Sequence, residues 1–342
     1  MELALYCPEY GYYETKKDIG RRGDFYTSVS VGRLFGRLLA FQFAEWLGRL
    51  PPAGRKPCIV EAGPHDGQLA RDILDWLQSR RPEQFGRIEY CLLEPSPRRR
   101  EWQRETLEAF APHVRWGDSL DSLLPPAGPA EPRPPGLNGI VFSNEFLDAM
   151  PVRRHGWDAG RRKWFEWGVA LEGGRCVWAR IEDSDFRFPL PELEAVLPDG
   201  YTVETSPAAG RWWREAADRL EHGWLLTLDY GGEAEELFTP ARARGTLRAY
   251  SRHHASHDVL ANPGEQDLTA HVNFSALRQA GEAGGLKTEY FDTQARFLTG
   301  ILSRAAGGAS LGEWDAGLAR QFQTLTHPEH LGRAFTVLAQ SK

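Results

Sequence analysis

The stretch CIVEAGPHDGQL at residues 58–69 decides the fold of this chain. It begins as a short apolar strand at 58–60 and runs at once into a glycine-containing turn at 61–67. Leu69, Ile73 and Leu77 then follow at helical spacing. A strand, a glycine turn and a helix in this order let the backbone approach a ligand, and the free N–H groups at the start of the helix can bind it. We therefore predict that the turn is a ligand-binding loop.

The segments on either side of this loop alternate between strands and helices. Further strands are predicted by short apolar runs at 90–94, 114–116, 139–143, 224–230, 287–291 and 335–338. Helical patterns occupy 34–50, 98–110, 207–220 and 274–283. Ser206-Pro207 is a typical helix start, with a capping serine before a proline. The alternation predicts an α/β fold with a doubly wound, mostly parallel sheet.

The alternation is interrupted by aromatic-rich runs at 152–188, which Gly173-Gly174 divides and which predict an antiparallel β insertion. The first thirty residues, rich in Gly, Tyr and Asp, predict an ordered loop. Residues 231–272 predict a long loop that carries small elements of its own. We expect the following parts: an N-terminal cap and lid (1–52), the first part of the binding core (53–151), the β insertion (152–205) and the remainder of the core (206–342).

The ligand-binding loop lacks the pattern of a phosphate-binding loop. Dinucleotide-binding loops use three glycines as GxGxxG, whereas Gly63 and Gly67 here lie four residues apart with His65 between them. A carboxylate at Glu61 would repel a pyrophosphate but would favour a ligand that carries a sulfonium and an ammonium. Glu94, which ends the second strand, can accept hydrogen bonds from two ribose hydroxyls. Both carboxylates fit S-adenosylmethionine.

Composition and length describe an ordinary globular protein of 342 residues with 41% hydrophobic residues. A net charge of −6 argues against a nucleic-acid partner. No run reaches the about 18 to 20 apolar residues of a membrane span, and the first residues lack the pattern of a signal peptide. We therefore expect a cytoplasmic protein with no membrane insertion.

The four cysteines form no CxxC pair, and Cys58 and Cys91 lie in apolar runs where they should be buried. His253-His254 and His257 have a spacing that could suit a metal, but no acidic or cysteine partner clusters beside them. We therefore predict neither a disulfide framework nor a metal site.

Several runs that follow one another across nearly the whole chain carry a more specific signal. They are Tyr10-Gly11-Tyr12-Tyr13, Ile19-Gly20 with Gly23-Asp24-Phe25-Tyr26-Thr27-Ser28, Glu61 to Leu69, Leu93-Glu94-Pro95-Ser96-Pro97, Asn144 to Pro151, Leu228-Asp229-Tyr230-Gly231 and Asn262 to Val272. In this order and spacing the chain resembles the MidA-type methyltransferases, whose mitochondrial members are complex I assembly factors, and it looks like a bacterial member.

This resemblance implies a class I methyltransferase fold with a Rossmann-like sheet of seven strands, S-adenosylmethionine as cofactor and methylation of protein arginine. The chain differs from the family pattern at His65, where a second glycine is usual, and at Val29-Ser30, where Pro-Glu is usual. Asn273 stands where the family usually has Asp. Compared with the family, the N-terminus is short by one helix, so we expect that the native start lies upstream.

The loop and the resemblance together predict the residues that contact the cofactor. These are Glu61, Gly63, Pro64, Gly67, Glu94, Ser96, Asp118, Ser119, Gly23 and Thr27. Asp118 follows the third strand, where it could meet the adenine amino group, although an ordinary turn aspartate is the alternative. Gly23 and Thr27 belong to a segment that could fold over the cofactor as a lid.

The predicted catalytic residues follow the fourth strand, at the sheet edge that faces the ligand crevice. An arginine guanidinium is a poor nucleophile because it is a delocalised cation with a pKa above about 12. We expect Glu145 to orient and neutralise this acceptor, and Asn144 to accept a hydrogen bond from the reacting nitrogen. Asp148 is a second candidate acid, with a cap of the following turn as the alternative.

Two other functions stay open at this point: an N-methyltransferase of a small molecule, and a catalytically silent scaffold that binds the cofactor. A nicotinamide oxidoreductase is disfavoured because the loop lacks the glycines it needs. The expected partner is a protein that contains arginine. The sequence does not predict an oligomeric state.

Overall fold

The computed structural model of the chain describes most of its length. The described residues are 1–15, 27–52, 55–124, 136–182, 184–251, 254–305, 311–312 and 314–342. Gly23 and His253 lie outside these ranges, as does most of the predicted lid segment.

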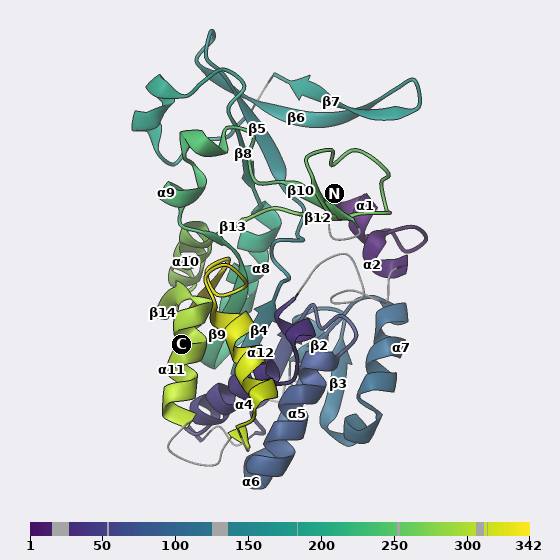
Figure 1. Cartoon of the computed structure of the whole chain (residues 1–342), viewed down its shortest axis with the longest axis vertical. Coiled ribbons are helices and arrows are strands. Elements are labelled where there is room, and N and C mark those ends of the chain that lie inside the picture. The colour runs from purple at the N-terminus through teal and green to yellow at the C-terminus, as the bar shows by residue number, and fades with distance from the viewer. Residues whose placement is uncertain are drawn as a thin grey trace, which may run out of the picture.

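A sheet with seven main strands forms the lower part of the molecule in Figure 1. Its strands are β1 (Cys58–Ala62), β2 (Glu89–Leu93), β3 (Val114–Gly117), β4 (Leu137–Asn144), β9 (Leu220–Gly232), β14 (Lys287–Thr293) and β15 (Phe335–Ser341). They lie in the order β14-β15-β9-β4-β1-β2-β3. All neighbours are parallel except β15, which is antiparallel to both β9 and β14. The short β13 (Val272–Asn273) adds to β9. The predicted α/β fold is therefore confirmed, and β13 is added to the seven predicted strands.

Helices cover both faces of this sheet. One face packs against α4 (Leu34–Leu47), α5 (Gln68–Arg80), α11 (Gln294–Ala305) and α12 (Ala316–Thr326). The other face packs against α8 (Pro207–Arg219) and α10 (Phe274–Ala283). Shorter helices are α6 (Pro82–Phe85), α7 (Pro97–Thr106), η1 (Glu108–His113) and η2 (Asp121–Leu123). None of the described helices is long and apolar enough to cross a membrane.

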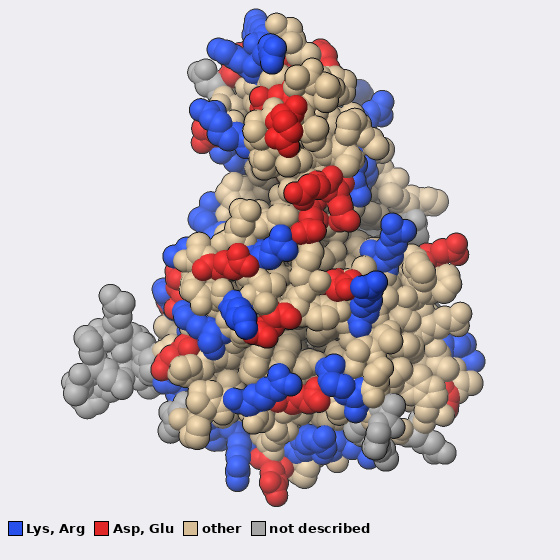
Figure 2. Space-filling model, turned by 90° about the vertical axis from the view of Figure 1, so that its left-hand side faces the viewer, with Lys and Arg blue, Asp and Glu red and all other residues tan. Residues whose placement is uncertain are grey.

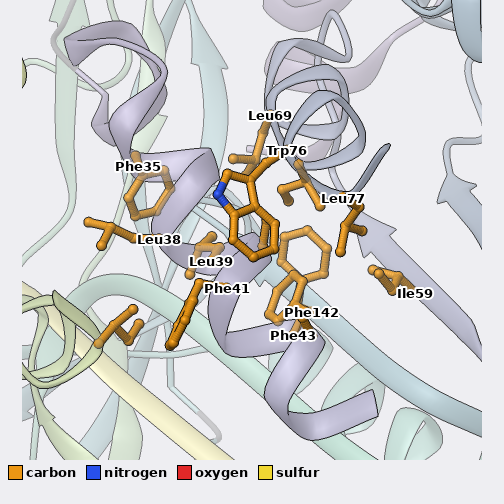
Figure 3. Packing of buried hydrophobic residues seen from close by; sticks show 14 of the residues in the cluster. Phe35, Leu38, Leu39, Phe41, Phe43, Ile59, Leu69, Trp76, Leu77 and Phe142 are labelled. Atoms are coloured by element: carbon orange, nitrogen blue, oxygen red, sulfur yellow. The ribbon is translucent and has the colours of Figure 1, made fainter. Parts of the chain in front are cut away.

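Aromatic packing fixes α4 and α5 against the first face. Figure 3 shows side chains of α4 directed toward Trp76 and Leu77 of α5. The ring centroids of Phe43 in α4 and Phe142 in β4 lie 4.9 Å apart. Because α5 begins directly after the glycine turn, this packing holds the start of that helix beside the ends of the strands.

Two glycines let the central strands approach closely. Gly139 of β4 lies between Cys58 of β1 and Gly223 of β9, and both glycines have positive φ angles, 151° and 126°. A Cβ atom on Gly139 would lie 1.9 Å from the carbonyl oxygen of Cys58.

We expect Gly139→Ala to lower the free energy of unfolding by about 2–4 kcal/mol, because the backbone of two central strands must separate. The matched control is Gly210→Ala in α8, where an added Cβ meets nothing within 4 Å and should stabilise the helix by about 0.5–1 kcal/mol. Denaturant unfolding of both variants measures the difference. Equal stabilities would contradict the close approach.

The predicted β insertion is a separate antiparallel sheet at the top of Figure 1. It contains β5 (Arg153–Asp158), β6 (Lys163–Glu172), β7 (Arg175–Ile181) and β8 (Thr202–Thr205), in the order β7-β6-β5-β8. η3 (Pro191–Val196) precedes β8. Buried aromatic rings such as Trp157, Trp164 and Tyr201 form a small core together with residues of α9 (Ala234–Leu237).

The long segment predicted at 231–272 carries small elements of its own, as expected. This region contains α9 (Ala234–Leu237), η4 (Pro240–Arg242), β10 (Arg248–Ser251), β11 (His254–Ser256) and β12 (Asp267–Thr269). The last three form an antiparallel sheet in the order β11-β10-β12. Ala249 and Leu268 of this sheet, and Leu247 just before β10, are buried against the N-terminal segment. The strands therefore gain their stability from distant residues rather than from local pattern.

The N-terminal segment was predicted as a loop, but it contains α1 (Glu2–Tyr6), α2 (Tyr12–Thr15) and α3 (Ser28–Val31). Leu5 and Tyr12 are fully buried, and the Thr27 side chain caps α3 by accepting a hydrogen bond from Ser30 N. Tertiary burial and capping thus override the Gly- and Tyr-rich composition.

Figure 2 shows one face of the molecule, on which Lys and Arg alternate with Asp and Glu over both the core and the insertion. Cys58 and Cys91 are buried and free, as predicted. Among the described residues, no three His, Cys, Asp or Glu side chains are grouped so that they could hold a metal ion.

Candidate active site

A cavity of about 860 Å³ opens at the carboxyl ends of β1, β2 and β4. Most of the predicted site residues line it. These are Glu61, Gly63, Pro64, Glu94, Ser96, Asp118, Ser119, Thr27, Asn144 and Glu145. Gly67 and Asp148 are not among the lining residues, and Gly23 lies outside the described part of the chain.

The turn after β1 has the geometry of a close-approach loop. Gly63, His65 and Gly67 all have positive φ angles, of 69°, 45° and 83°. A Cβ on Gly63 would lie 2.6 Å from Cδ2 of Phe146, so only glycine fits there. Gly67 is the residue before α5 and lets the chain enter the helix. His65 adopts the left-handed conformation that a glycine adopts most readily, and Gln103 donates a hydrogen bond to its carbonyl oxygen at 2.8 Å.

Glu61 ends β1 under this turn, with only 3% of its surface exposed. The Tyr90 hydroxyl donates a hydrogen bond to Glu61 Oε2 at 2.6 Å. Burial raises the pKa of Glu61 to about 8, and the bond from Tyr90 opposes this shift. Without a cationic ligand, burial therefore favours the protonated form of this side chain.

Glu94 directly follows β2, and its carboxylate accepts four hydrogen bonds. Its Oε1 accepts from Ser96 N at 2.8 Å and from Arg99 Nη2 at 2.8 Å. Its Oε2 accepts from Arg99 Nε at 2.9 Å and from Gln103 Nε2 at 3.2 Å. A ribose hydroxyl at Glu94 would have to share the carboxylate with Arg99, so ribose binding by Glu94 stays a prediction.

Ser96 and the N-terminal segment meet beside Glu94. Ser96 Oγ caps α7 by accepting from Arg99 N, and it donates to Glu14 Oε2 at 2.7 Å. Arg99 Nη1 lies 3.3 Å from Glu14 Oε1. Glu14 also lines the cavity, and it was not among the predicted site residues. The only hint was that the neighbouring run, Tyr10 to Tyr13, belongs to the family pattern.

Asp118 and Ser119 line the cavity at the end of β3, on an exposed turn. Ser122 Oγ accepts from the backbone N–H groups of both residues. Hydrogen bonds from the Ser122 and Ser119 side chains lower the pKa of Asp118. Asp118 therefore belongs to an ordinary turn and also lines the cavity, so a contact with the adenine amino group stays a prediction.

Asn144 and Glu145 form the wall at the end of β4. Glu145 has a φ of 51°, and its Oε1 accepts from Ser28 N at 2.9 Å and from Asn144 Nδ2 at 3.0 Å. Glu145 Oε2 and Asn144 Oδ1 are buried and have no hydrogen-bond partner among the described residues. Burial raises the pKa of Glu145 to about 8, opposed by the bonds from Ser28 and Asn144.

Asp148 lies behind this wall, buried beside Asp229. Its side chain is hydrogen-bonded to Asp229, and burial raises the pKa of Asp148 well above its usual range. Because Asp148 does not line the cavity, its position does not favour direct contact with the methyl acceptor. That role stays a prediction.

Four aromatic residues of the cavity wall were not predicted: Tyr6, Tyr13, Phe146 and Trp212. The ring centroids of Phe146 and Trp212 lie 5.3 Å apart, edge to face. Trp212 Nε1 is also buried without a partner in the described part of the chain. Phe146 belongs to the Asn144 to Pro151 run, whereas Trp212 reads in sequence as helix packing.

Comparisons with known proteins match almost the whole chain. The family model that matches residues 38–291 is described as "Putative S-adenosyl-L-methionine-dependent methyltransferase". The chain is 29% identical to the mitochondrial "Protein arginine methyltransferase NDUFAF7 homolog" of Drosophila melanogaster, over 99% of this chain and 79% of that protein. It is 30% identical to the mitochondrial "Protein arginine methyltransferase NDUFAF7" of Danio rerio, over 98% of this chain and 80% of that protein.

Solved structures give the same result. A protein of Burkholderia thailandensis bound to S-adenosyl-homocysteine is 34% identical, with a TM-score of 0.82 over 100% of this chain and 86% of that chain. A second structure from the same organism is 32% identical, with a TM-score of 0.78 over 100% of this chain and 85% of that chain.

Proposed function

The chain belongs to the S-adenosyl-L-methionine-dependent methyltransferase family that its residues 38–291 match, and we propose that it methylates arginine side chains of a protein. The family match and the S-adenosyl-homocysteine bound to the similar structure identify the enzyme class and the cofactor. Arginine as the acceptor is our proposal. It is supported by the names of the relatives and by the chemistry of one wall of the cavity.

The observation that carries this proposal is the pair of buried oxygens at the end of β4. Glu145 Oε2 and Asn144 Oδ1 lack hydrogen-bond donors among the described residues. Leaving such atoms unpaired costs free energy. A guanidinium carries five N–H donors and a positive charge, so an arginine side chain in the cavity would supply what both atoms lack.

The remaining residues of the cavity fit the cofactor. Gly63 leaves space at the turn that a Cβ would fill, and Glu61 and Glu94 offer carboxyl groups to a cationic nucleoside. When bound, S-adenosylmethionine supplies a methyl group on a positively charged sulfur. Glu145 would hold an N–H of the acceptor and take the proton that its nitrogen loses on methylation. A pKa of about 8 suits this role near neutral pH.

The test uses tritiated S-adenosylmethionine and a cell lysate. We expect label in a discrete protein band and, after complete hydrolysis of that protein, in methylarginine. Because the mitochondrial members of the MidA-type family are complex I assembly factors, we propose a subunit of a respiratory complex as the first purified acceptor to test.

The same experiment separates the alternatives. Label in a small-molecule fraction would support a small-molecule N-methyltransferase. Label in methyl-lysine would contradict arginine specificity while leaving protein methylation intact. Tight cofactor binding with no labelled product would support a silent scaffold.

Cofactor affinity should fall as the pH is lowered from about 8, the raised pKa of Glu61. A cationic ligand favours the ionised carboxylate, so below this pKa binding must release a proton, and the affinity should fall by up to about tenfold per pH unit. Calorimetry with S-adenosylmethionine at several pH values, in buffers of different ionisation enthalpy, measures both the slope and the released proton.

Two variants test whether Glu61 causes the pH dependence of cofactor affinity. Glu61→Gln should remove it, whereas Glu145→Gln should keep it, although Glu145 also has a raised pKa. A slope that survives in Glu61→Gln would show that another group titrates.

A further inference from the structure

We propose that Asp229 is the positioning residue for Glu145: its carboxylate fixes the turn after β4 that presents the Glu145 side chain to the cavity. The inference rests on the role proposed above for Glu145. It adds a residue of β9 to the reaction, although Asp229 does not line the cavity.

The contacts of Asp229 converge on the turn after β4. The side chain is fully buried, and its Oδ2 accepts from Phe146 N at 3.1 Å and from Leu147 N at 2.8 Å. Its Oδ1 accepts from Tyr230 N at 2.8 Å. One carboxylate therefore holds the two residues that directly follow Glu145 and ties them to the neighbouring strand.

Glu145 needs this restraint because its backbone is in the left-handed region, with a φ of 51°. A residue other than glycine adopts this conformation only when its surroundings impose it. Glu145 N also donates to the carbonyl oxygen of Leu228, at 3.0 Å, the residue before Asp229. The end of β9 thus fixes the chain on both sides of the Glu145 Cα atom.

Asp148 supports the charge of Asp229. It is hydrogen-bonded to Asp229, and the pKa of Asp148 is raised well above its usual range by burial and by the charges of Asp229, Asp267 and Glu145. The pKa of Asp229 is raised by burial only to about 6, because backbone N–H groups stabilise its charge. Burial thus favours the neutral form of Asp148 more strongly than that of Asp229, whose carboxylate is held by backbone N–H groups.

An amide cannot replace this carboxylate. Asparagine has one acceptor oxygen and two N–H donors, so in Asp229→Asn a donor would face Tyr230 N or the pair of Phe146 and Leu147 N–H groups. The turn would have to move, and Glu145 would move with it.

We therefore expect Asp229→Asn to lower kcat by about 100-fold, the typical cost of misplacing a catalytic group by about 1 Å. The KM for S-adenosylmethionine and the affinity for S-adenosyl-homocysteine should change far less than kcat, because, of the cofactor loop, only Gly63 lies against the turn, through Phe146. The matched control is Asp292→Asn on β14: Asp292 Oδ1 also accepts from the next backbone N–H, Thr293 N at 2.7 Å, but it lies at the far edge of the sheet, and its replacement should leave kcat unchanged.

A double-mutant cycle identifies the route of the effect. If Asp229 acts through Glu145, then adding Asp229→Asn to Glu145→Gln should cause almost no further loss of kcat. Independent, multiplying losses would overturn the proposal, as would a loss of cofactor affinity equal to the loss of kcat.

Amide hydrogen exchange gives a readout that does not need an acceptor. The Phe146 and Leu147 amides should exchange faster in Asp229→Asn, while amides of β1 keep their protection. Unchanged exchange at both amides would overturn the proposal even if no substrate were found. If the wild type methylates lysine or a small molecule, the arginine assignment fails, but the cycle can be run with that acceptor.

Asp229→Ser is the second variant, since it removes the charge without introducing an amide donor. Like Asp229→Asn, it should lower kcat far more than it changes the KM for S-adenosylmethionine. If both variants are recovered only unfolded, Asp229 supports the fold as a whole rather than one side chain, and the proposal is wrong.

Discussion

Replacing Glu145 with glutamine should lower the rate of methyl transfer by about 10²- to 10⁴-fold, the usual contribution of a general base. Glutamine keeps an oxygen that can accept from Ser28 N and Asn144 Nδ2, so the side chain should keep its place. The buried Oε2 position, which has no partner among the described residues, becomes an NH₂ group that can neither accept an N–H from the acceptor nor take its proton. Single-turnover kinetics with the acceptor found in the lysate measures the loss.

The pH dependence of the rate gives an internal check. Glu145 acts as the carboxylate, and its raised pKa of about 8 means that activity should be lost as the pH falls below this value. Glu145→Gln should be slow at every pH. The control is Glu172→Gln on the β6–β7 hairpin, which should match the wild type. Full activity of Glu145→Gln with normal cofactor binding would remove Glu145 from the mechanism.

Gly63→Ala should weaken cofactor binding by about 30- to 1,000-fold, which corresponds to about 2–4 kcal/mol. The φ of 69° strains any residue with a Cβ. The new methyl group would also lie 2.6 Å from the ring of Phe146, so the turn would have to shift where the backbone approaches the ligand. Calorimetry with S-adenosyl-homocysteine measures the change.

Gly285→Ala is the matched control for Gly63→Ala. Gly285 has a φ of 83°, but an added Cβ there meets nothing within 4 Å. Gly285→Ala should therefore lower stability without changing cofactor affinity. A Phe146→Ala, Gly63→Ala double variant should recover part of the affinity, because the ring that collides with the new methyl is gone. No recovery would show that backbone strain alone causes the loss.

The central sheet could be predicted from the sequence because its signals are local. Each core strand is a short apolar run, and the turn after β1 carries its glycines in the sequence itself. α11 was missed although Phe297, Ile301 and Ala305 lie at helical spacing and are buried. β8 was missed because its four residues, Thr202–Thr205, become a strand only by pairing with β5.

The site could be predicted in part for a topological reason. Glu61, Glu94 and Glu145 follow strands whose carboxyl ends meet at one edge of a parallel sheet, so strand assignment alone brings them together. Glu14 could not be found in this way. Its contact with Ser96 joins residues 82 positions apart, and the helix that carries it depends on burial against a sheet near residue 250.

The antiparallel strand β15 has a consequence for how the protein is made. It pairs along β9 from Phe335 to Ser341, yet it is synthesised long after β9 leaves the ribosome. Until then, most of one edge of β9 faces solvent in the nascent chain, and an open apolar edge strand invites aggregation. Substitutions that slow this final pairing should therefore appear in the cell as a need for chaperones and a loss of soluble yield, while the molecules that do fold keep their full turnover.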